Sequence, residues 1–258
     1  MEDVKKIIEL DRSIIPACDV TFDTYKKIVE ATKDVEKIGA YKVGISFLDV
    51  GLKAVVDFTR EHTHKPVIYD HQKAGTDIPD TPNHFMDSMV RAGVDAVILF
   101  PQAGPVTEYE WIKSAQEKNL GVIVGGEMTH PRYLDGDLSN GKKKDYNKLF
   151  SELGIERELG GYLRKDAPDD MYELAARIGV TDFVVPGNKP DRISYYKGLV
   201  EKCGVKNPVF YSPGLVAQGG EVSEGAKAAG KRFHAIVGRG IYSATDMKKA
   251  AEELCSKL

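Results

Sequence analysis

Three charged residues of alternating sign, Asp70, Lys73 and Asp77, lie close together directly after an apolar run at 66–70. A lysine held between carboxylates keeps its positive charge, and such an ammonium group can stabilise a developing anion or donate a proton. A structural salt bridge is the alternative interpretation. Because buried ion pairs are costly and perturbed charge networks concentrate at active sites, the pattern favours a catalytic cluster.

Two more charged residues lie in or at the end of predicted strands near the N-terminus. Asp19 ends the first of these strands, and Lys42 lies within the second. If the second and third strands are neighbours, Lys42 comes close to the cluster. The carboxylates of Asp19, Asp70 and Asp77 could bind Mg²⁺. Since the adjacent lysines already neutralise these carboxylates, we expect no metal at this site.

Two glycine-containing loops near the C-terminus have the composition of a phosphate site. One contains Pro213, Gln218 and Gly219, and the other contains Gly238 and Arg239. Glycine lets backbone N–H groups approach an anion, an amide side chain adds donors, and a guanidinium group matches phosphate oxygens. The alternative is that the glycines only turn the chain. Their combination with Arg239 favours a ligand that carries a phosphate.

The elements that must position these residues alternate along the whole chain. Most of the short runs are continuously apolar, which is typical of parallel strands that are covered on both faces. The predicted strands are 13–19, 40–46, 66–70, 94–100, 121–125, 181–186, 208–211 and 234–238. Amphipathic stretches between them predict helices, among them 24–37, 48–61, 106–118, 171–178, 191–201 and 244–256.

Eight strand–helix units in 258 residues predict a (β/α)₈ TIM barrel, an α/β fold of roughly 250 residues. An open doubly wound sheet is the alternative, but 18–22 lacks the glycine-rich phosphate turn that such folds carry after their first strand. The segment 133–166 breaks the rhythm, which indicates an insertion after strand five with a helix near 145–153. We therefore expect a single domain over 1–258, with its active site at the carboxyl ends of the strands.

The composition argues against several kinds of partner. With 36 Lys and Arg against 39 Asp and Glu, the net charge of −3 lacks the basic excess of a nucleic-acid binder. The longest apolar run, 94–100, is far shorter than the roughly 20 residues of a membrane span, and 1–12 does not resemble a signal peptide. Because Cys18, Cys203 and Cys255 form no plausible disulfide framework, we expect a cytoplasmic protein.

With these residues the chain resembles the orotidine 5′-phosphate decarboxylase family over nearly its whole length, the insertion excepted. The motifs occur in the family's order. They are Asp19, Lys42, the cluster of Asp70, Lys73 and Asp77 followed by Ile78-Pro79, the run 127–131, the loop from Pro213 to Gly220, and the run 237–242. The cluster is one residue longer in each gap than the family's Asp-x-Lys-x-x-Asp. A bulge or an early end of the strand must therefore aim Lys73 into the site.

The resemblance implies conversion of orotidine 5′-monophosphate to uridine 5′-monophosphate and CO₂, a step of pyrimidine biosynthesis that needs no cofactor. It implies that Lys73 stabilises the carbanion at pyrimidine C6 and protonates it. Asp70 would crowd the departing carboxylate and favour its loss. Lys42 and Asp77 would hold the catalytic lysine charged and oriented, so the implied catalytic residues are Lys73, Asp70, Asp77 and Lys42.

The resemblance also implies a set of substrate-binding residues and a homodimer. Asp19 would accept hydrogen bonds from the ribose hydroxyls, Lys42 would also touch the ribose, and Thr129 would bind the pyrimidine edge. The phosphate would be held by Pro213, Gln218, Arg239 and backbone amides near Gly219 and Gly238, and Thr81 completes the binding set. In the family the second aspartate of the cluster reaches into the neighbouring subunit's site, so Asp77 would act there.

Two other functions remain open. The first is an Mg²⁺-dependent decarboxylase or aldolase of the same barrel superfamily that acts on sugar phosphates. The second is a non-catalytic barrel that only binds a nucleotide. The intact set of lysines and aspartates favours an enzyme.

Overall fold

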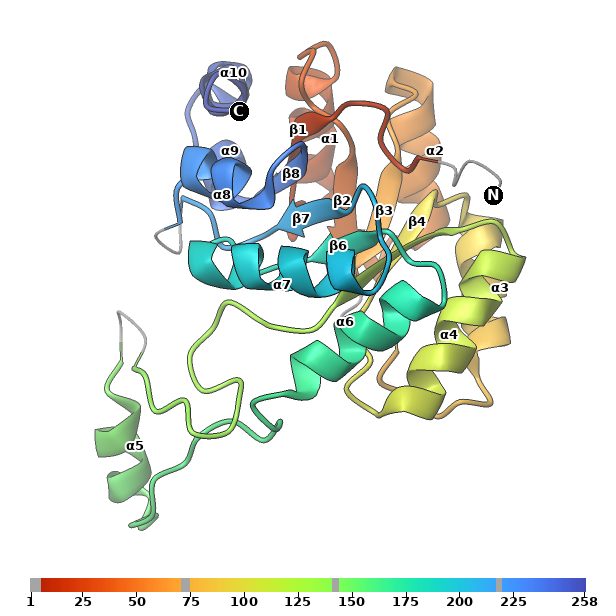
Figure 1. Ribbon diagram of the computed structural model, residues 1–258. Helices are drawn as coiled ribbons and strands as arrows, with labels where there is room; N and C mark the ends of the chain where they lie inside the picture. Colours follow the sequence, from red (N-terminus) through yellow and green to blue (C-terminus); the bar gives the residue numbers. More distant parts are fainter. Residues whose placement is uncertain (1–5, 71–74, 141–143, 217–219) are drawn as a thin grey trace.

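The structure is a computed structural model that describes residues 6–70, 75–140, 144–216 and 220–258 (Figure 1). In this part of the chain, parallel strands form one eight-stranded sheet in the order β1-β8-β7-β6-β5-β4-β3-β2. They are β1 (Arg12–Pro16), β2 (Tyr41–Gly44), β3 (Val67–Asp70), β4 (Ala96–Leu99), β5 (Gly121–Gly125), β6 (Asp182–Val184), β7 (Val209–Ser212) and β8 (Arg232–Val237). Parallel bridges Ile14–Ile38 and Ala17–Lys42 join β1 to the β2 segment and close the barrel. The predicted TIM barrel is confirmed, and the open-sheet alternative is wrong.

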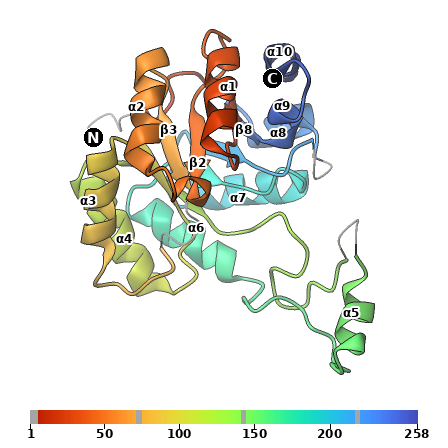
Figure 2. The ribbon, with the colours of Figure 1, turned by 180° about the vertical axis from the view of Figure 1, so that it is seen from behind.

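Helices cover the outside of this barrel (Figures 1 and 2). They are α1 (Phe22–Thr32), the 3₁₀ helix η1 (Ile45–Phe47), α2 (Leu52–His62), α3 (Pro82–Ala92), α4 (Pro105–Glu117), α6 (Ala167–Arg177), α7 (Pro190–Lys202), α8 (Val222–Ala229), α9 (Arg239–Tyr242) and α10 (Met247–Cys255). Of these, η1, α3, α8 and α9 correspond to none of the helix ranges named from the sequence. One further helix, α5 (Tyr146–Glu152), stands apart from the barrel in both views.

Local sequence signals account for many of the helix ends. Proline lacks a backbone N–H, and the N–H groups of the first helical turn have no partner within the helix, so proline fits there. It lies in the first turn of α3, α4, α6 and α7. Gly93 ends α3 in the left-handed conformation, with φ 81°, and leads the chain towards β4. The predicted helix 48–61 begins later, at Leu52, because Gly51 before it has φ 88°.

The strands alternate their side chains between two apolar layers. In β3, Val67 and Tyr69 pack with the helices, whereas Ile68 belongs to the layer inside the barrel. Because both layers are buried, the strands are continuously apolar in the sequence. The same alternation turns Asp70, the last residue of β3, towards the barrel interior.

The segment 133–166 leaves the barrel after β5 and returns at α6 (Figure 1). It contains α5, which confirms the helix predicted near 145–153. Among the described residues from 134 to 167, none is buried. We call 133–166 the arm.

Two further expectations from the sequence concern membrane-spanning helices and disulfides. Within the described ranges, no helix has both the length and the apolar character needed to cross a membrane. Cys18, Cys203 and Cys255 are all free thiols. Cys18 is fully buried, and burial raises the pKa of its thiol well above the usual range, so it packs as a small apolar residue.

Candidate active site

A cavity of about 290 Å³ opens at the carboxyl end of the barrel. Strand residues or the segments that follow the strands form its wall. It contains these predicted site residues: Asp19, Lys42, Asp70, Thr129, Pro213, Gly238 and Arg239. Apolar side chains, among them Ile98, Phe100, Val184 and Ile236, complete the lining. A second cavity of about 240 Å³, lined by residues such as Asn119 and Thr181, contains none of the predicted site residues.

Lys42 and Asp70 form a buried ion pair in the wall of the mouth cavity. Their strands are neighbours, with Gly44 paired to Asp70, so both side chains lie inside the barrel near its carboxyl end. The distance from Lys42 Nζ to Asp70 Oδ2 is 2.8 Å, and the two residues are 8% and 7% exposed. Asp19 Oδ2 lies 3.9 Å from the same ammonium group. Lys42 thus lies next to Asp70, as expected for neighbouring second and third strands.

The electrostatics of this pair keep a positive charge in the cavity. Burial lowers the pKa of Lys42, but the carboxylates of Asp70 and Asp19 outweigh burial and raise that pKa above its ordinary value. Lys42 is therefore an ammonium group at neutral pH. Removing one partner of a buried ion pair is destabilising, so Lys42 and Asp70 stabilise each other in the cavity wall.

Gly44 allows the close approach of strands β2 and β3 at this point. A Cβ atom at position 44 would lie 2.6 Å from the carbonyl oxygen of Asp70 and 3.4 Å from Asp19 Oδ1. Side chains larger than hydrogen would push the carboxylates and the lysine apart. The geometry of the ion pair therefore depends on a glycine next to it.

The predicted phosphate residues lie on the adjacent part of the wall. Pro213 follows β7, while Gly238 and Arg239 form the start of α9 after β8. The predicted residues Gln218 and Gly219 lie outside the described part of the chain. The loop that contains them begins and ends at one place, because Leu215 and Gly220 are joined by a β-bridge. Arg239 thus provides a guanidinium group at the edge of the same cavity as Lys42.

Glu127, which follows β5, is the second buried carboxylate in the cavity wall and is 4% exposed. Its two oxygens accept hydrogen bonds from Lys189 Nζ and Arg192 Nε, each at 2.8 Å. The hydroxyl of Tyr196 donates to the same carboxylate at 2.5 Å. Burial raises the pKa of Glu127, but these hydrogen bonds outweigh it and hold the pKa below its usual range.

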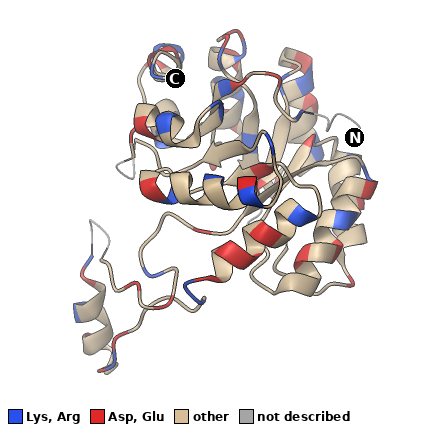
Figure 3. Cartoon of the chain, viewed as in Figure 1, with Lys and Arg blue, Asp and Glu red and all other residues tan. Residues whose placement is uncertain are grey.

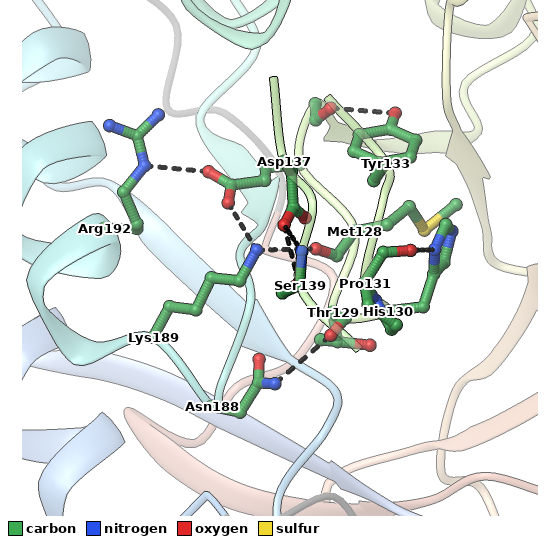
Figure 4. A network of polar contacts seen from close by, with 12 residues as sticks. Met128, Thr129, His130, Pro131, Tyr133, Asp137, Ser139, Asn188, Lys189 and Arg192 are labelled. Atoms are coloured by element: carbon green, nitrogen blue, oxygen red, sulfur yellow. Dashed lines mark hydrogen bonds and ion pairs between the residues drawn. The ribbon is translucent and has the colours of Figure 1, made fainter. Parts of the chain in front are cut away.

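This network holds the loop that carries Thr129. Lys189 also donates to the carbonyl of Met128 at 3.4 Å, and the Asn188 amide donates to the carbonyl of Thr129 at 3.2 Å (Figure 4). Two consecutive residues of the β6–α7 loop therefore bond to two consecutive residues of the β5 loop. On the other side, the N–H of Gly187 donates to the carbonyl of Pro213 at 2.8 Å. The β6–α7 loop thus connects the Thr129 side of the cavity with the phosphate side.

Three residues of the predicted site lie elsewhere. Lys73 lies outside the described residues, so its bulge stays a prediction. Asp77 and Thr81 are described but do not line the cavity. The Asp77 carboxylate accepts from the N–H of Ile78 at 2.8 Å, and its carbonyl accepts from the hydroxyl of Thr107 at 2.9 Å. Thr81 donates its hydroxyl to the carbonyl of Ile78 at 3.1 Å. These contacts hold the loop after β3 at the surface of its own barrel.

Sequence reasoning did not single out Asn188, Lys189 or Arg192. The available signal was their position, since they directly follow the strand predicted at 181–186, at the end of the barrel where the site lies. Their partner could not be found in the same way. Glu127 and Lys189 are 62 positions apart, and the pairing of β5 with β6 brings them together.

The donor set does not form a metal site by itself. Among the described residues, no three His, Cys, Asp or Glu side chains converge as metal ligands would. The expectation that the reaction needs no cofactor stays a prediction.

Known proteins similar to this chain share both its sequence pattern and its architecture. The model of the Orotidine 5′-phosphate decarboxylase / HUMPS family matches residues 12–254. The orotidine 5′-phosphate decarboxylase of Methanococcus maripaludis is 29% identical over 92% of this chain and 93% of that protein. The enzyme of that name from Pyrococcus abyssi is 28% identical over 95% of this chain and 98% of its own length.

Solved structures give the same result for the fold. The orotidine 5′-monophosphate decarboxylase of Methanocaldococcus jannaschii, complexed with the inhibitor BMP, aligns with a TM-score of 0.74 and 25% identity. The alignment covers 96% of this chain and 98% of that one. The orotidine 5′-phosphate decarboxylase of Pyrococcus horikoshii aligns with a TM-score of 0.69 and 25% identity, over 95% and 98% of the two chains.

Proposed function

This chain belongs to the Orotidine 5′-phosphate decarboxylase / HUMPS family, and on that premise we propose that it converts orotidine 5′-monophosphate to uridine 5′-monophosphate and CO₂. This reaction is a step of pyrimidine biosynthesis and makes the protein a carboxy-lyase. We further propose that the chain works in the cytoplasm as one barrel domain over 1–258, with 133–166 inserted in it.

The observation that carries the proposal is the buried Lys42–Asp70 pair in a cavity that also holds Arg239. The substrate carries a phosphate and a carboxylate, so its site needs cationic groups for binding and one anionic group that disfavours the bound carboxylate. Arg239 suits the phosphate because its planar group donates two parallel hydrogen bonds. Asp70 supplies the anionic group, and Lys42 forms an ion pair with it.

The proposed mechanism needs only side chains. The bond between C6 and the carboxylate carbon breaks, CO₂ leaves, and the electron pair stays on C6. The ammonium group of Lys73 stabilises this carbanion electrostatically and then donates its proton to C6. Asp70 lies beside the substrate carboxylate and favours its departure. Lys42 holds Asp70, and together with Asp77 it keeps Lys73 charged and oriented.

Substrate binding is proposed to use the rest of the wall. Asp19 accepts from ribose hydroxyls, and Thr129 contacts the pyrimidine edge. Arg239 and Pro213, with Gln218 and the amides near Gly219 and Gly238, hold the phosphate. Binding energy from this remote group can assemble the site around the pyrimidine, which raises kcat rather than only lowering KM.

We propose that the active form is a homodimer with shared sites. Asp77 is exposed and bonds within its own loop, outside its own cavity, and Thr81 lies on the same loop. A second copy can take up both residues in its site. Mixing Lys73→Ala and Asp77→Ala proteins tests this, because hybrid dimers then contain one site with both native residues. After full exchange about half of the dimers are hybrids and one of their two sites is native, so the specific activity should return to roughly a quarter of the native value. No recovery after demonstrated subunit exchange contradicts the sharing of sites.

A direct assay tests the activity itself. Purified protein is mixed with orotidine 5′-monophosphate in EDTA, and the loss of substrate absorbance is followed. We expect turnover that EDTA does not abolish, that Lys73→Ala removes, and that the exposed control Lys248→Ala leaves unchanged. Folded protein that leaves the absorbance unchanged refutes the proposal. Turnover of a sugar phosphate that requires Mg²⁺ would instead assign the chain to the second function expected for this barrel.

A further inference from the structure

The arm carries large apolar side chains that the chain itself leaves uncovered. Leu138, Leu149, Leu153 and Tyr162 are 37%, 38%, 67% and 93% exposed. α5 buries none of its residues, and it stands away from the barrel in both views (Figures 1 and 2). Ordering a residue costs conformational entropy, which buried apolar surface normally offsets. Within its own chain, the described part of the arm obtains little of that compensation.

The arm is nevertheless built by specific contacts, with Arg132 at its base. The guanidinium group donates to the Asn147 side-chain oxygen at 2.7 Å and to the Ser139 carbonyl at 3.3 Å. It lies 5.5 Å from the ring centre of Phe150 and 6.0 Å from that of Tyr146. These contacts fix α5 relative to the start of the arm. A defined shape with an uncovered apolar surface is the property of a docking element rather than of a solvated loop.

A second group of exposed apolar side chains lies in the segments that follow other strands of the barrel, and we call it the mouth patch. It follows the carboxyl ends of β2, β3 and β4. Its members are Ile45, Leu48 and Val50, which are 53%, 72% and 37% exposed, and Ile78, Val106 and Tyr109, which are 56%, 64% and 42% exposed. It is continuous with the loop of Asp77, which the proposed dimer places in a partner's site.

We propose that the arm of each copy packs on the mouth patch of a second copy of this chain. Both surfaces lie at the carboxyl end of the barrel, because the arm follows β5 and the patch follows β2 to β4. A twofold axis through a mouth-to-mouth dimer presents each surface to the other copy, so the contact forms twice. An interface of standard size takes about 20–30 residues from each partner, and the arm, with 34 residues, can supply a large share of them.

The charge pattern fits this occupant. Acidic and basic residues are interspersed along the arm, so it lacks the single sign that binding to nucleic acid or to an anionic surface needs (Figure 3). The contact is therefore apolar in origin, and added salt should not dissociate it. The proposal rests on the shared-site dimer proposed above, and it gives the arm, which is not part of the barrel, a role in that dimer.

Two variants of the arm and one of the patch test the contact. Leu153→Glu and Leu48→Glu each place a charge in the proposed interface, from its two sides. In the third variant, 138–159 are replaced by two glycines. A short link is possible because a Cβ at Gly160 would lie 3.6 Å from the carbonyl oxygen of Asp137. The matched control is Val90→Glu on α3, 47% exposed and in neither surface.

The readout is the dimer dissociation constant from sedimentation over a range of protein concentrations. Each substitution occurs twice per dimer, and removing a buried leucine contact costs about 1.5–3 kcal/mol. We expect the constant to rise at least about 100-fold in the three variants and to stay within about 3-fold in the control. An unchanged constant in the arm and patch variants overturns the proposal. An altered KM without dissociation would mean that the arm covers its own mouth, which also overturns it.

The same proteins separate this proposal from the proposed function. Decarboxylation of orotidine 5′-monophosphate is measured at concentrations far above the dissociation constant of each variant. Dimer weakening with activity retained there supports the arm contact and the activity. Inactive wild-type protein whose dimer depends on the arm refutes the function and leaves the arm contact standing.

Discussion

Glu127→Gln tests the idea that a buried carboxylate holds the Thr129 loop of the cavity. The substitution keeps the shape of the side chain and removes its charge. Glu127 is 4% exposed and accepts hydrogen bonds from Lys189 and Arg192 at 2.8 Å each. The side-chain oxygen of glutamine can still accept one of these hydrogen bonds, but this acceptor is neutral. The amide nitrogen cannot accept the other bond.

The magnitude follows from the number of bonds that change. A hydrogen bond to a charged group contributes about 1.5–3 kcal/mol, against about 0.5–1.5 kcal/mol for a neutral one, so the bond that glutamine still accepts loses about 1 kcal/mol and the other loses about 1.5–3 kcal/mol. The lysine and arginine side chains are 31% and 34% exposed, and water partly replaces what they lose. We expect a loss of about 2 kcal/mol in the free energy of unfolding at pH 7, or about 4–8 °C in Tm for a chain of this size.

The stabilising effect of Glu127 depends on pH in a defined direction. The native pKa of Glu127 lies below its value in the unfolded chain, which is about 4.3. Its stabilising effect is therefore fully present above that pH and disappears as the pH falls through the lower native value. The wild type and Glu127→Gln should differ at pH 7 and converge under strongly acidic conditions.

The assay is thermal or urea unfolding of both proteins at several pH values. The matched control is Glu173→Gln, which removes a surface ion pair with Arg177 at 2.7 Å. Surface pairs of this kind contribute little, so the control should shift Tm by at most about 2 °C. If Glu127→Gln costs no more than the control at pH 7, or if its deficit persists at low pH, the network does not hold the loop as described.

Three further predictions concern the cavity wall. Lys42→Met removes the 2.8 Å ion pair with Asp70, and unfolding experiments should show a loss of about 3–5 kcal/mol in the free energy of unfolding. A loss below about 1 kcal/mol would mean that the pair is not buried in solution. Gly44→Ala places a Cβ 2.6 Å from a β3 carbonyl and should abolish turnover, whereas Gly198→Ala in α7, where a Cβ meets nothing within 4 Å, should leave turnover unchanged and stabilise the fold by about 1 kcal/mol. Arg239→Ala should lower kcat/KM for the phosphorylated substrate by about 10–150-fold, and added inorganic phosphate should inhibit the variant less than the wild type; equal inhibition would contradict a phosphate contact.

The sequence by itself determined the barrel and the side of it that carries the site. Continuous apolar runs mark strands whose two faces are both covered, and this property is local, so each of the eight strands could be found from its own residues. Strand alternation then places Lys42 and Asp70 on the inner face, and their ion pair follows once β2 and β3 are neighbours. The helix of the arm was also found locally, from its own pattern.

Only the tertiary structure decided which distant groups meet. Glu127 is buried with Lys189 and Arg192 because the pairing of β5 with β6 brings the loops after them together, and no local pattern encodes a contact across 62 positions. The location of Asp77 outside its own cavity depends on how the loop after β3 packs against α4. Exposure is likewise a property of the whole fold. In the sequence, a leucine of the arm cannot be told from a leucine of the core. Only the path of the arm away from the barrel shows that its leucines are exposed.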